Sequence, residues 1–189
     1  LMVARGATDG PVLGLTAAIH GDELNGISVI QRLFADIDVS ELRGTVVAIP
    51  VVNIPGFNHQ QRFFGDGSDI NHLMPGKADG NTSQVYAYRL VTRFLKQVDH
   101  LLDLHTASRG RVNSYYVRAD MSQESTRKLA LLQNPQLIVH NPPNDGTFRG
   151  TAEEQEKGHP TLSANKIWRR RPTARMVAKN WQWLTCSHD

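Results

Sequence analysis

The sequence predicts an α/β fold in which helices cover both faces of a mostly parallel, mixed sheet. Two apolar, β-branched runs at 12–19 and 45–52 suit strands buried on both faces, and a segment with helical spacing at 24–34 lies between them. A strand, a helix and a second strand in this order form a βαβ unit, in which the two strands are parallel. A third apolar run at 100–104 follows another helical segment, so the alternation continues along the chain.

The other elements follow in order between and after these runs. Pro50 weakens the far end of the run at 45–52, because proline cannot donate a hydrogen bond within a central strand. The long loop at 53–80 contains several glycines and prolines, and its length is typical of functional or disordered segments. Ser122 is the expected N-cap of the helix that follows it. The further expected elements are a helix at 82–98, a strand at 112–118, a helix at 122–132 and a strand at 136–139.

The composition predicts a globular protein that has no membrane partner. The 189 residues are 40% hydrophobic and 21% charged, and no apolar run approaches the ~18 residues of a membrane span. The first residues lack the basic start and apolar centre of a signal peptide. The single cysteine, Cys186, excludes an internal disulfide and fits a reducing compartment. We therefore expect a cytoplasmic protein, and the oligomeric state stays open.

Residues 156–189 differ in composition from residues 1–155. The first part carries 14 Lys and Arg against 16 Asp and Glu, whereas the second carries 7 against 2 and holds all three tryptophans. We expect an α/β domain at 1–155 and a divergent basic tail at 156–189 that is truncated or read in a shifted frame. Because Leu1 precedes Met2 and no strand comes before the first strong run, we also expect the sequence to be a fragment or a trimmed chain.

Metal-binding side chains follow two of the apolar runs, at the point where each run ends. His20 and Glu23 come directly after the first run, and His105 follows the third. The carboxyl ends of neighbouring parallel strands meet at one edge of a sheet, where ligands bind in open α/β folds. His20 and Glu23 alone would indicate no more than a strand end and a solvated glutamate in a helix's first turn. With His105 they form the His₂Glu set of catalytic zinc sites, and Asp103 either orients a ligand histidine or simply ends its strand.

Four short motifs carry a resemblance to the succinylglutamate desuccinylase/aspartoacylase family, itself similar to the zinc carboxypeptidases. They occur in family order, with family-like gaps, between about residue 10 and about residue 165. The motifs are His20-Gly-Asp-Glu23, then Asn53 with Arg62, then Asp69-Ile-Asn71-His72-Leu-Met-Pro75-Gly76, and finally Asp103-Leu-His105-Thr-Ala.

The resemblance implies a zinc carboxypeptidase-like fold that holds one Zn²⁺ per chain through His20, Glu23 and His105. It also implies that Arg62 polarises the scissile carbonyl and stabilises its oxyanion, which a fixed guanidinium can do. Asn71 matches a position that helps to hold a substrate carboxylate. The expected substrate-binding set is Asn53, Arg62, Asn71, His72, Arg109 and Arg111.

His72 departs from the family pattern, which has arginine at this position. An imidazole cannot grip a carboxylate through two parallel hydrogen bonds as a guanidinium does. Arg109, Arg111 and Arg118 follow the third ligand closely and are candidates for the missing cation. The alternative is that these arginines are solvated surface charges.

Asn165 is the second departure. In the stretch Gly158-His-Pro-Thr-Leu-Ser-Ala-Asn165 it stands where the family has the glutamate that takes a proton from the zinc-bound water. An amide cannot accept and return a proton as a carboxylate does. No general base is therefore found, and beyond Asn165 the family's small C-terminal β domain is missing.

The predicted function is a zinc-dependent amide hydrolase, a deacylase that acts on N-acyl amino acids or related small carboxylates. The alternative is a catalytically impaired zinc-binding fragment or pseudoenzyme that lacks the general-base glutamate. A third interpretation is nucleic-acid binding by the basic, tryptophan-containing tail. The tail is short and has no known module, and residues 1–155 are net acidic, so the sequence argues against this third interpretation.

Overall fold

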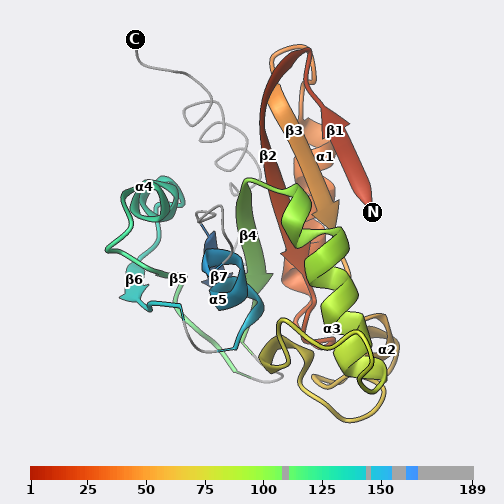
Figure 1. The fold of residues 1–189 in the computed structure, drawn as a ribbon. Coiled ribbons are helices and arrows are strands. Elements are labelled where there is room, and N and C mark those ends of the chain that lie inside the picture. Colours follow the sequence, from red (N-terminus) through yellow and green to blue (C-terminus); the bar gives the residue numbers. More distant parts are fainter. Residues whose placement is uncertain (108–110, 144–145, 155–160, 166–189) are drawn as a thin grey trace.

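The computed structural model describes residues 1–107, 111–143 and 146–154, and the backbone of a last strand at 161–165 (Figure 1). Its centre is one seven-stranded sheet with strand order β1-β3-β2-β4-β7-β5-β6. The strands are β1 (Met2–Arg5), β2 (Thr8–Ala17), β3 (Arg43–Ile49), β4 (His100–His105), β5 (Tyr116–Ala119), β6 (Leu137–His140) and β7 (Thr161–Asn165). The helices are α1 (Asn25–Asp36), α2 (Ile54–Asn58), α3 (Thr82–Arg93), α4 (Glu124–Leu132) and α5 (Phe148–Glu153), with short 3₁₀ turns η1 (Ile70–His72) and η2 (Leu95–Gln97).

The sheet is mixed and mostly parallel, as the sequence predicts. Strands β3, β2, β4 and β7 run parallel to one another, and so do β5 and β6. The antiparallel pairs are β1 with β3 and β5 with β7. The expected pairing of the first and third apolar runs is confirmed, since β2 and β4 are neighbours from Leu13 with His100 to Ala17 with Leu104. The carboxyl ends of β2 and β4 therefore lie side by side.

Helices cover both faces of the sheet and bury a separate apolar cluster on each. Helices α1 and α4 pack on one face through Ile30, Leu33 and Leu129, which contact the buried side chains of β2, β4 and β5. Helices α3 and α5 cover the other face with α3 residues Leu90 and Val91 and with the fully buried Phe148 of α5. Figure 1 shows α3 and α5 in front of the strands and α1 behind them. None of the described helices is long and apolar enough to cross a membrane.

Helix α1 begins close to the sheet because its second residue is a glycine. A Cβ on Gly26 would lie 2.7 Å from the Cβ of Ala17 and 2.8 Å from the Cβ of Leu104, so no larger residue fits without movement. The absence of a side chain here brings the start of α1 against the ends of β2 and β4. This close approach fixes the short turn at 18–24, which joins β2 to α1.

The structure corrects several expected boundaries and adds elements that local sequence patterns did not predict. The expected helix at 82–98 ends at Arg93, and η2 follows; the expected strand at 112–118 begins only at Tyr116. Helix α4 has Gln123 rather than Ser122 as its N-cap, because the Ser122 hydroxyl donates instead to Asp120 at 2.6 Å. The loop at 53–80 contains α2 and η1, and the sequence did not predict β1, α5 or β7.

Candidate metal centre

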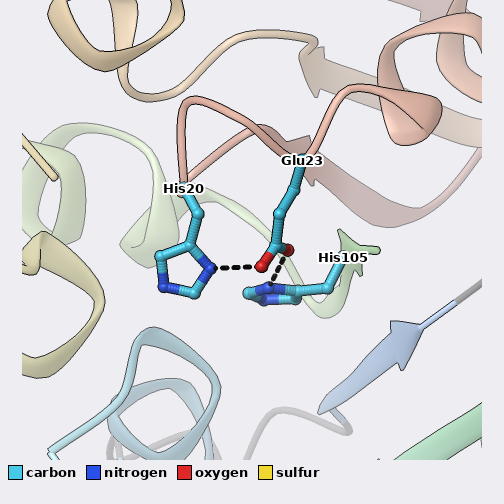
Figure 2. Close-up of side chains that lie close together, drawn as sticks. All are labelled: His20, Glu23 and His105. Carbon is cyan, nitrogen blue, oxygen red and sulfur yellow. Dashed lines mark hydrogen bonds and ion pairs between the residues drawn. The ribbon is translucent and has the colours of Figure 1, made fainter. Parts of the chain in front are cut away.

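His20, Glu23 and His105 lie together at the carboxyl edge of the sheet (Figure 2). His20 and Glu23 occupy the turn between β2 and α1, whereas His105 is the last residue of β4. The Nδ1 atoms of His20 and His105 each lie 3.0 Å from one oxygen of the Glu23 carboxylate. All three side chains are buried, with exposed fractions of 4%, 4% and 8%. The three side chains therefore lie close together, as their positions at the ends of parallel strands predict.

Two further carboxylates lie beside the outer nitrogens of the imidazoles. The Nε2 atom of His105 lies 2.7 Å from Asp103, and the Nε2 atom of His20 lies 3.3 Å from Asp69. The other oxygen of Asp103 accepts a hydrogen bond from the Thr16 hydroxyl at 2.7 Å, which anchors Asp103 to β2. Each ring is therefore oriented with Nδ1 toward Glu23. Of the two alternative roles that the sequence allows for Asp103, orienting a ligand histidine or ending its strand, the contact with His105 favours the first. The sequence did not indicate the contact of Asp69 with His20.

The charges of the cluster shift its pKa values strongly. Burial lowers the pKa of His105, but the Asp103 and Glu23 carboxylates outweigh burial and raise this pKa to about 10. Burial raises the pKa of Glu23, but hydrogen bonds from His105 and His20 outweigh it and lower this pKa to about 2. The pKa of Asp69 is likewise lowered by His20 and Arg62 against the effect of burial. The Glu23 and Asp69 carboxylates are thus ionised at neutral pH and favour positive charge on the neighbouring imidazoles.

These residues fit a bound divalent metal ion. Their candidate ligand atoms, one from each side chain, all lie within 4.8 Å of one another. Two imidazoles and one carboxylate are a common set of ligands in catalytic metal sites and leave a coordination position open. Carboxylates on the far nitrogens of ligand histidines are the usual support of such sites. The arrangement is therefore consistent with a metal centre built on strand ends.

A cavity of about 440 Å³ opens beside this cluster. Its lining includes the three cluster residues and four residues of the predicted substrate-binding set, Arg62, Asn71, His72 and Arg111. Residues that the predicted site did not contain also line it; these are Thr106, Ala107, Asn113, Tyr116, Arg118, Asn141, Thr147 and Arg149. Arg118 was considered as a candidate cation only. Arg109 lies outside the described residues.

Arg62 lies directly beside the cluster. Its Nε and Nη2 atoms donate to one oxygen of Asp69 at 3.0 and 2.8 Å, and its Nη1 atom lies 3.6 Å from Glu23. Asp69 therefore contacts both Arg62 and His20. The guanidinium is partly exposed toward the cavity, with 31% of the side chain accessible.

Asn53 and Asn71 form hydrogen bonds that connect the backbone segments around the site. Asn53 is fully buried; its side chain accepts from Gly56 N at 2.8 Å, which caps α2, and donates to the Arg62 carbonyl at 3.2 Å. It is absent from the described cavity lining, so the structure gives it a supporting position rather than a contact surface. Asn71 lines the cavity, and its Oδ1 accepts from Phe148 N at 3.1 Å, which links η1 to the start of α5.

Arg149 is a buried cation of the cavity wall that the sequence did not indicate. Only 2% of the residue is exposed, and its Nη1 donates to Glu153 one helical turn later at 2.8 Å. A pair of opposite charges four residues apart is common on solvated helices, so the spacing alone could not identify it. Glu153 and Glu154 are the glutamates that precede position 165 most closely among the described residues. Glu153 is paired with Arg149, and Glu154 is exposed.

The backbone of β7 brings position 165 to the same edge of the sheet. β7 pairs with β4 in parallel, and Asn165 is the register partner of His105. On its other side Asn165 pairs with Tyr116, the first residue of β5. The stretch that the sequence compares with the family's base-carrying strand is therefore a central strand that ends beside a predicted metal ligand.

The fold and the cluster together define a class, the zinc carboxypeptidase-like α/β proteins. The model of the succinylglutamate desuccinylase/aspartoacylase catalytic domain matches residues 9–163. This chain belongs to that family, which confirms the resemblance carried by its four motifs. Desuccinylases and deacetylases of the family hydrolyse amides.

Individual relatives agree with this assignment. The chain is 32% identical over 109 residues to an N-alpha-acetyl-L-2,4-diaminobutyric acid deacetylase of Halomonas elongata, which covers 57% of this chain and 31% of that protein. A succinylglutamate desuccinylase/aspartoacylase structure from Rhodobacter sphaeroides matches with a TM-score of 0.75 and 26% identity, over 94% of this chain and 55% of that one. The murein-tripeptide amidase MpaA of Escherichia coli O157 shares the fold, with a TM-score of 0.59 and 15% identity over 96% and 82% of the two chains. The chain spans about a third of the deacetylase and about half of the Rhodobacter protein.

Proposed function

We propose that this chain forms the metal-binding and substrate-binding part of a zinc-dependent deacylase that acts on N-acyl amino acids. The observation that carries the proposal is the buried His20, Glu23 and His105 cluster, with each imidazole backed by a carboxylate, at the wall of a cavity of about 440 Å³. Cavities of this size accommodate small molecules. Membership of a family of amide hydrolases supports the same chemistry.

The reaction is hydrolysis of an amide, in which the C–N bond breaks and water supplies an oxygen to the acyl carbon and a proton to the departing nitrogen. A zinc ion bound by His20, Glu23 and His105 would act as a Lewis acid, polarising the carbonyl and making water a stronger nucleophile at neutral pH. Asp69 and Asp103 would keep both rings oriented. Arg62 would place its guanidinium where negative charge develops on the carbonyl oxygen.

The positive charge of the cavity supports an anionic substrate. Four arginines line it, and Glu23 is the one acidic side chain in the lining that the structure describes. Arg149 is held rigidly by Glu153, so its position is fixed before a ligand arrives. A small N-acyl amino acid brings one carboxylate and one scissile amide into such a site. His72 lines the same cavity and remains a candidate substrate contact.

Loss of a ligand histidine tests the metal site. Replacing His105 by alanine leaves one imidazole and one carboxylate, a pair that holds zinc poorly against competing water. We expect about one zinc per native chain after dialysis and almost none in His105→Ala. His59→Ala, in the loop outside the cavity, is the control and should keep its zinc. Equal zinc in His105→Ala and the native chain would remove His105 from the site.

A second function is favoured by the identity of position 165. The β7 register brings Asn165 beside His105, where the family motif has a glutamate that serves as base. Without a carboxylate there, the chain would bind metal and substrate yet hydrolyse slowly. A general base typically contributes ~10²–10⁴-fold to rate. This alternative predicts a metal-binding protein of low activity.

Restoring the carboxylate separates the two functions. We would assay N-acetylaspartate, N-succinylglutamate and N-acetyl-2,4-diaminobutyrate with the native chain and with Asn165→Glu, and we expect the variant to be faster by ~10²-fold or more. Asn165→Gln is the matched control, since it lengthens the side chain without adding a base. Rapid hydrolysis by the native chain that is lost on His20→Ala would reject the low-activity alternative and point to another base.

A further inference from the structure

Thr16 is a polar residue in the interior of the sheet. It is fully buried on β2, and its register partner on the neighbouring strand β4 is Asp103, which is also fully buried. Leu15 and Leu102, which precede them, belong to the apolar cluster under α1 and α4. Because side chains alternate along a strand, Thr16 and Asp103 lie together on the opposite face, beneath α3 and α5.

The carboxylate of Asp103 is held at both of its oxygens. Thr16 Oγ1 donates to Asp103 Oδ1 at 2.7 Å, and Asp103 Oδ2 lies 2.7 Å from His105 Nε2. A carboxylate that is held at one oxygen only rotates easily about its terminal torsion. The Thr16 hydroxyl therefore directs Oδ2 at the imidazole, and this contact leaves His105 Nδ1 pointing toward Glu23.

The surroundings of Thr16 make its hydroxyl important. A hydrogen bond in an apolar interior is stronger than one in water, and a buried charged acceptor that loses its donor is costly. Valine has nearly the shape of threonine but cannot donate, so this exchange removes the hydrogen bond to Asp103 and keeps the packing.

We propose that Thr16 is a positioning residue of the metal centre, whose hydroxyl acts on the bound ion through Asp103 and His105. The inference rests on the proposed function, because it concerns the metal ion bound there. Thr16 stands four residues before His20, and Asp103 stands two residues before His105. One side-chain hydrogen bond thus joins the two strands that deliver the ligands, and its loss changes both the affinity for the ion and the arrangement of its ligands.

Zinc affinity, measured by competition with a chromophoric chelator, tests the role of the hydroxyl. We expect Thr16→Val to bind zinc about tenfold more weakly, at the low end of the cost of disturbing the groups behind a ligand histidine. Thr16→Ser keeps the hydroxyl and should bind with close to native affinity, although the lost methyl group destabilises the fold. Thr126→Val is the matched control, since Thr126 is a buried threonine of α4 outside the cavity.

Cobalt in place of zinc gives a second readout. The visible absorption of bound Co²⁺ depends on the arrangement of its ligands, which a general loss of stability does not change in the folded protein. Thr16→Val should alter these bands, whereas Thr16→Ser and Thr126→Val should not. Circular dichroism checks that each variant is folded. If Thr16→Val does not fold, Thr16→Ala and Thr16→Ser form a second pair that differs only by the hydroxyl, and the alanine variant should bind zinc more weakly.

Native zinc affinity or a native cobalt spectrum in folded Thr16→Val would overturn the inference. Equal losses in Thr16→Val and Thr16→Ser would also overturn it, because the packing of the side chain would then be what matters. A native chain that binds neither metal would reject the metal site of the proposed function together with the inference. A loss in Thr16→Val that serine restores, in a chain that hydrolyses no N-acyl amino acid, would support the inference and reject the deacylase.

Discussion

Glu23 is the residue on which the cluster depends, because one carboxylate connects both imidazoles. Its two oxygens each lie 3.0 Å from a different Nδ1 atom, and one of them also accepts from the backbone N–H of Thr106. In the metal-free protein these contacts raise the pKa of both imidazoles and so favour their protonated forms. A metal ion must displace these protons before it can bind through Nδ1.

Metal binding should therefore release protons in a pH-dependent way. The pKa of His105 is raised to about 10, so its imidazole is protonated at pH 7.5, whereas Glu23 with a pKa of about 2 is already ionised. We expect zinc binding at pH 7.5 to release about one proton or more, and zinc affinity to rise with pH until His105 loses its proton. Calorimetry in two buffers of different ionisation enthalpy measures the number released. Identical heats in both buffers would show that the imidazoles are neutral before zinc binds.

Asp69 links the metal cluster to Arg62. One of its oxygens accepts from Arg62, and the other accepts from Asn71 N at 3.1 Å and lies 3.3 Å from His20. A single carboxylate thus orients a metal ligand and a guanidinium on the cavity wall. Its removal should affect both.

Replacing Asp69 by asparagine should weaken zinc binding by ~10–100-fold, the usual cost of losing the carboxylate behind a ligand histidine. Competition with a chromophoric chelator measures the affinity. Asp66→Asn is a matched control in the same loop, since Asp66 accepts from the backbones of Ser68 and Ser83 and not from the cluster. An equal loss of affinity in both variants would attribute the effect to loop stability.

The sequence could predict the candidate metal ligands but not most of the residues that surround and orient them. His20, Glu23 and His105 follow long apolar runs, and the edge at which parallel strands end is fixed by topology. The contact of Asp69 with His20 depends on the path of a loop that carries no periodic pattern. Arg149 reaches the cavity only because α5 lies over the same edge. Such contacts follow from tertiary packing, which local patterns do not encode.

Among the elements, the turn between β2 and α1 determines where His20 and Glu23 lie. It packs against the loop that carries Arg62, because Gly21 N donates to the Arg62 carbonyl at 3.4 Å. A Cβ on Gly21 would lie 2.1 Å from the carbonyl carbon of Gly56 and 2.3 Å from Phe57 N. Both of these contacts are backbone atoms of α2, which cannot yield as a flexible side chain does.

Gly21→Ala should therefore separate the ligand turn from α2 and weaken zinc binding by at least tenfold while the sheet stays folded. The separation moves His20 and Glu23 away from His105, and a small displacement of a ligand is costly at a metal site. Chelator competition gives the affinity, and far-ultraviolet circular dichroism checks the fold. Gly67→Ala is the control, since nothing lies within 4 Å of a Cβ there; its positive φ of 81° should cost some stability but no zinc affinity. Native zinc affinity in Gly21→Ala would contradict the packing argument.

The predicted elements are those with strong periodic patterns. Residues 12–19, 45–52 and 100–104 overlap β2, β3 and β4, and the helix expected at 24–34 overlaps α1. The missed elements β1, α5 and β7 are short, with four to six residues each. A strand of this length is stabilised by its neighbours in the sheet, so its own residues give a weak signal.

At the scale of the whole molecule, β7 joins two groups of strands that come from different parts of the chain. On one side lie β1, β3, β2 and β4, and on the other lie β5 and β6. Both of its neighbours, β4 and β5, are hydrogen-bonded to β7. The stability of the sheet should therefore depend strongly on this strand.

Ser163→Pro should destabilise the chain far more than Val3→Pro. Proline at position 163 removes a backbone N–H from a strand that has a partner on each side, and a buried acceptor left unpaired costs about 1–3 kcal/mol, whereas β1 is an edge strand with one neighbour. Urea unfolding followed by circular dichroism gives the free energies of unfolding. Equal destabilisation by the two prolines would show that β7 contributes no more than an edge strand.

The strand order has a consequence for how the protein is made. A ribosome releases β5 and β6 before β7, yet neither can join β4 until residues 161–165 have emerged. During that interval the growing chain exposes two open sheet edges, on β4 and on β5, which are templates for pairing with other nascent chains. A translational delay before residues 161–165 leave the ribosome should prolong this exposure and favour aggregation on the polysome, whereas the same delay after they have emerged should be harmless.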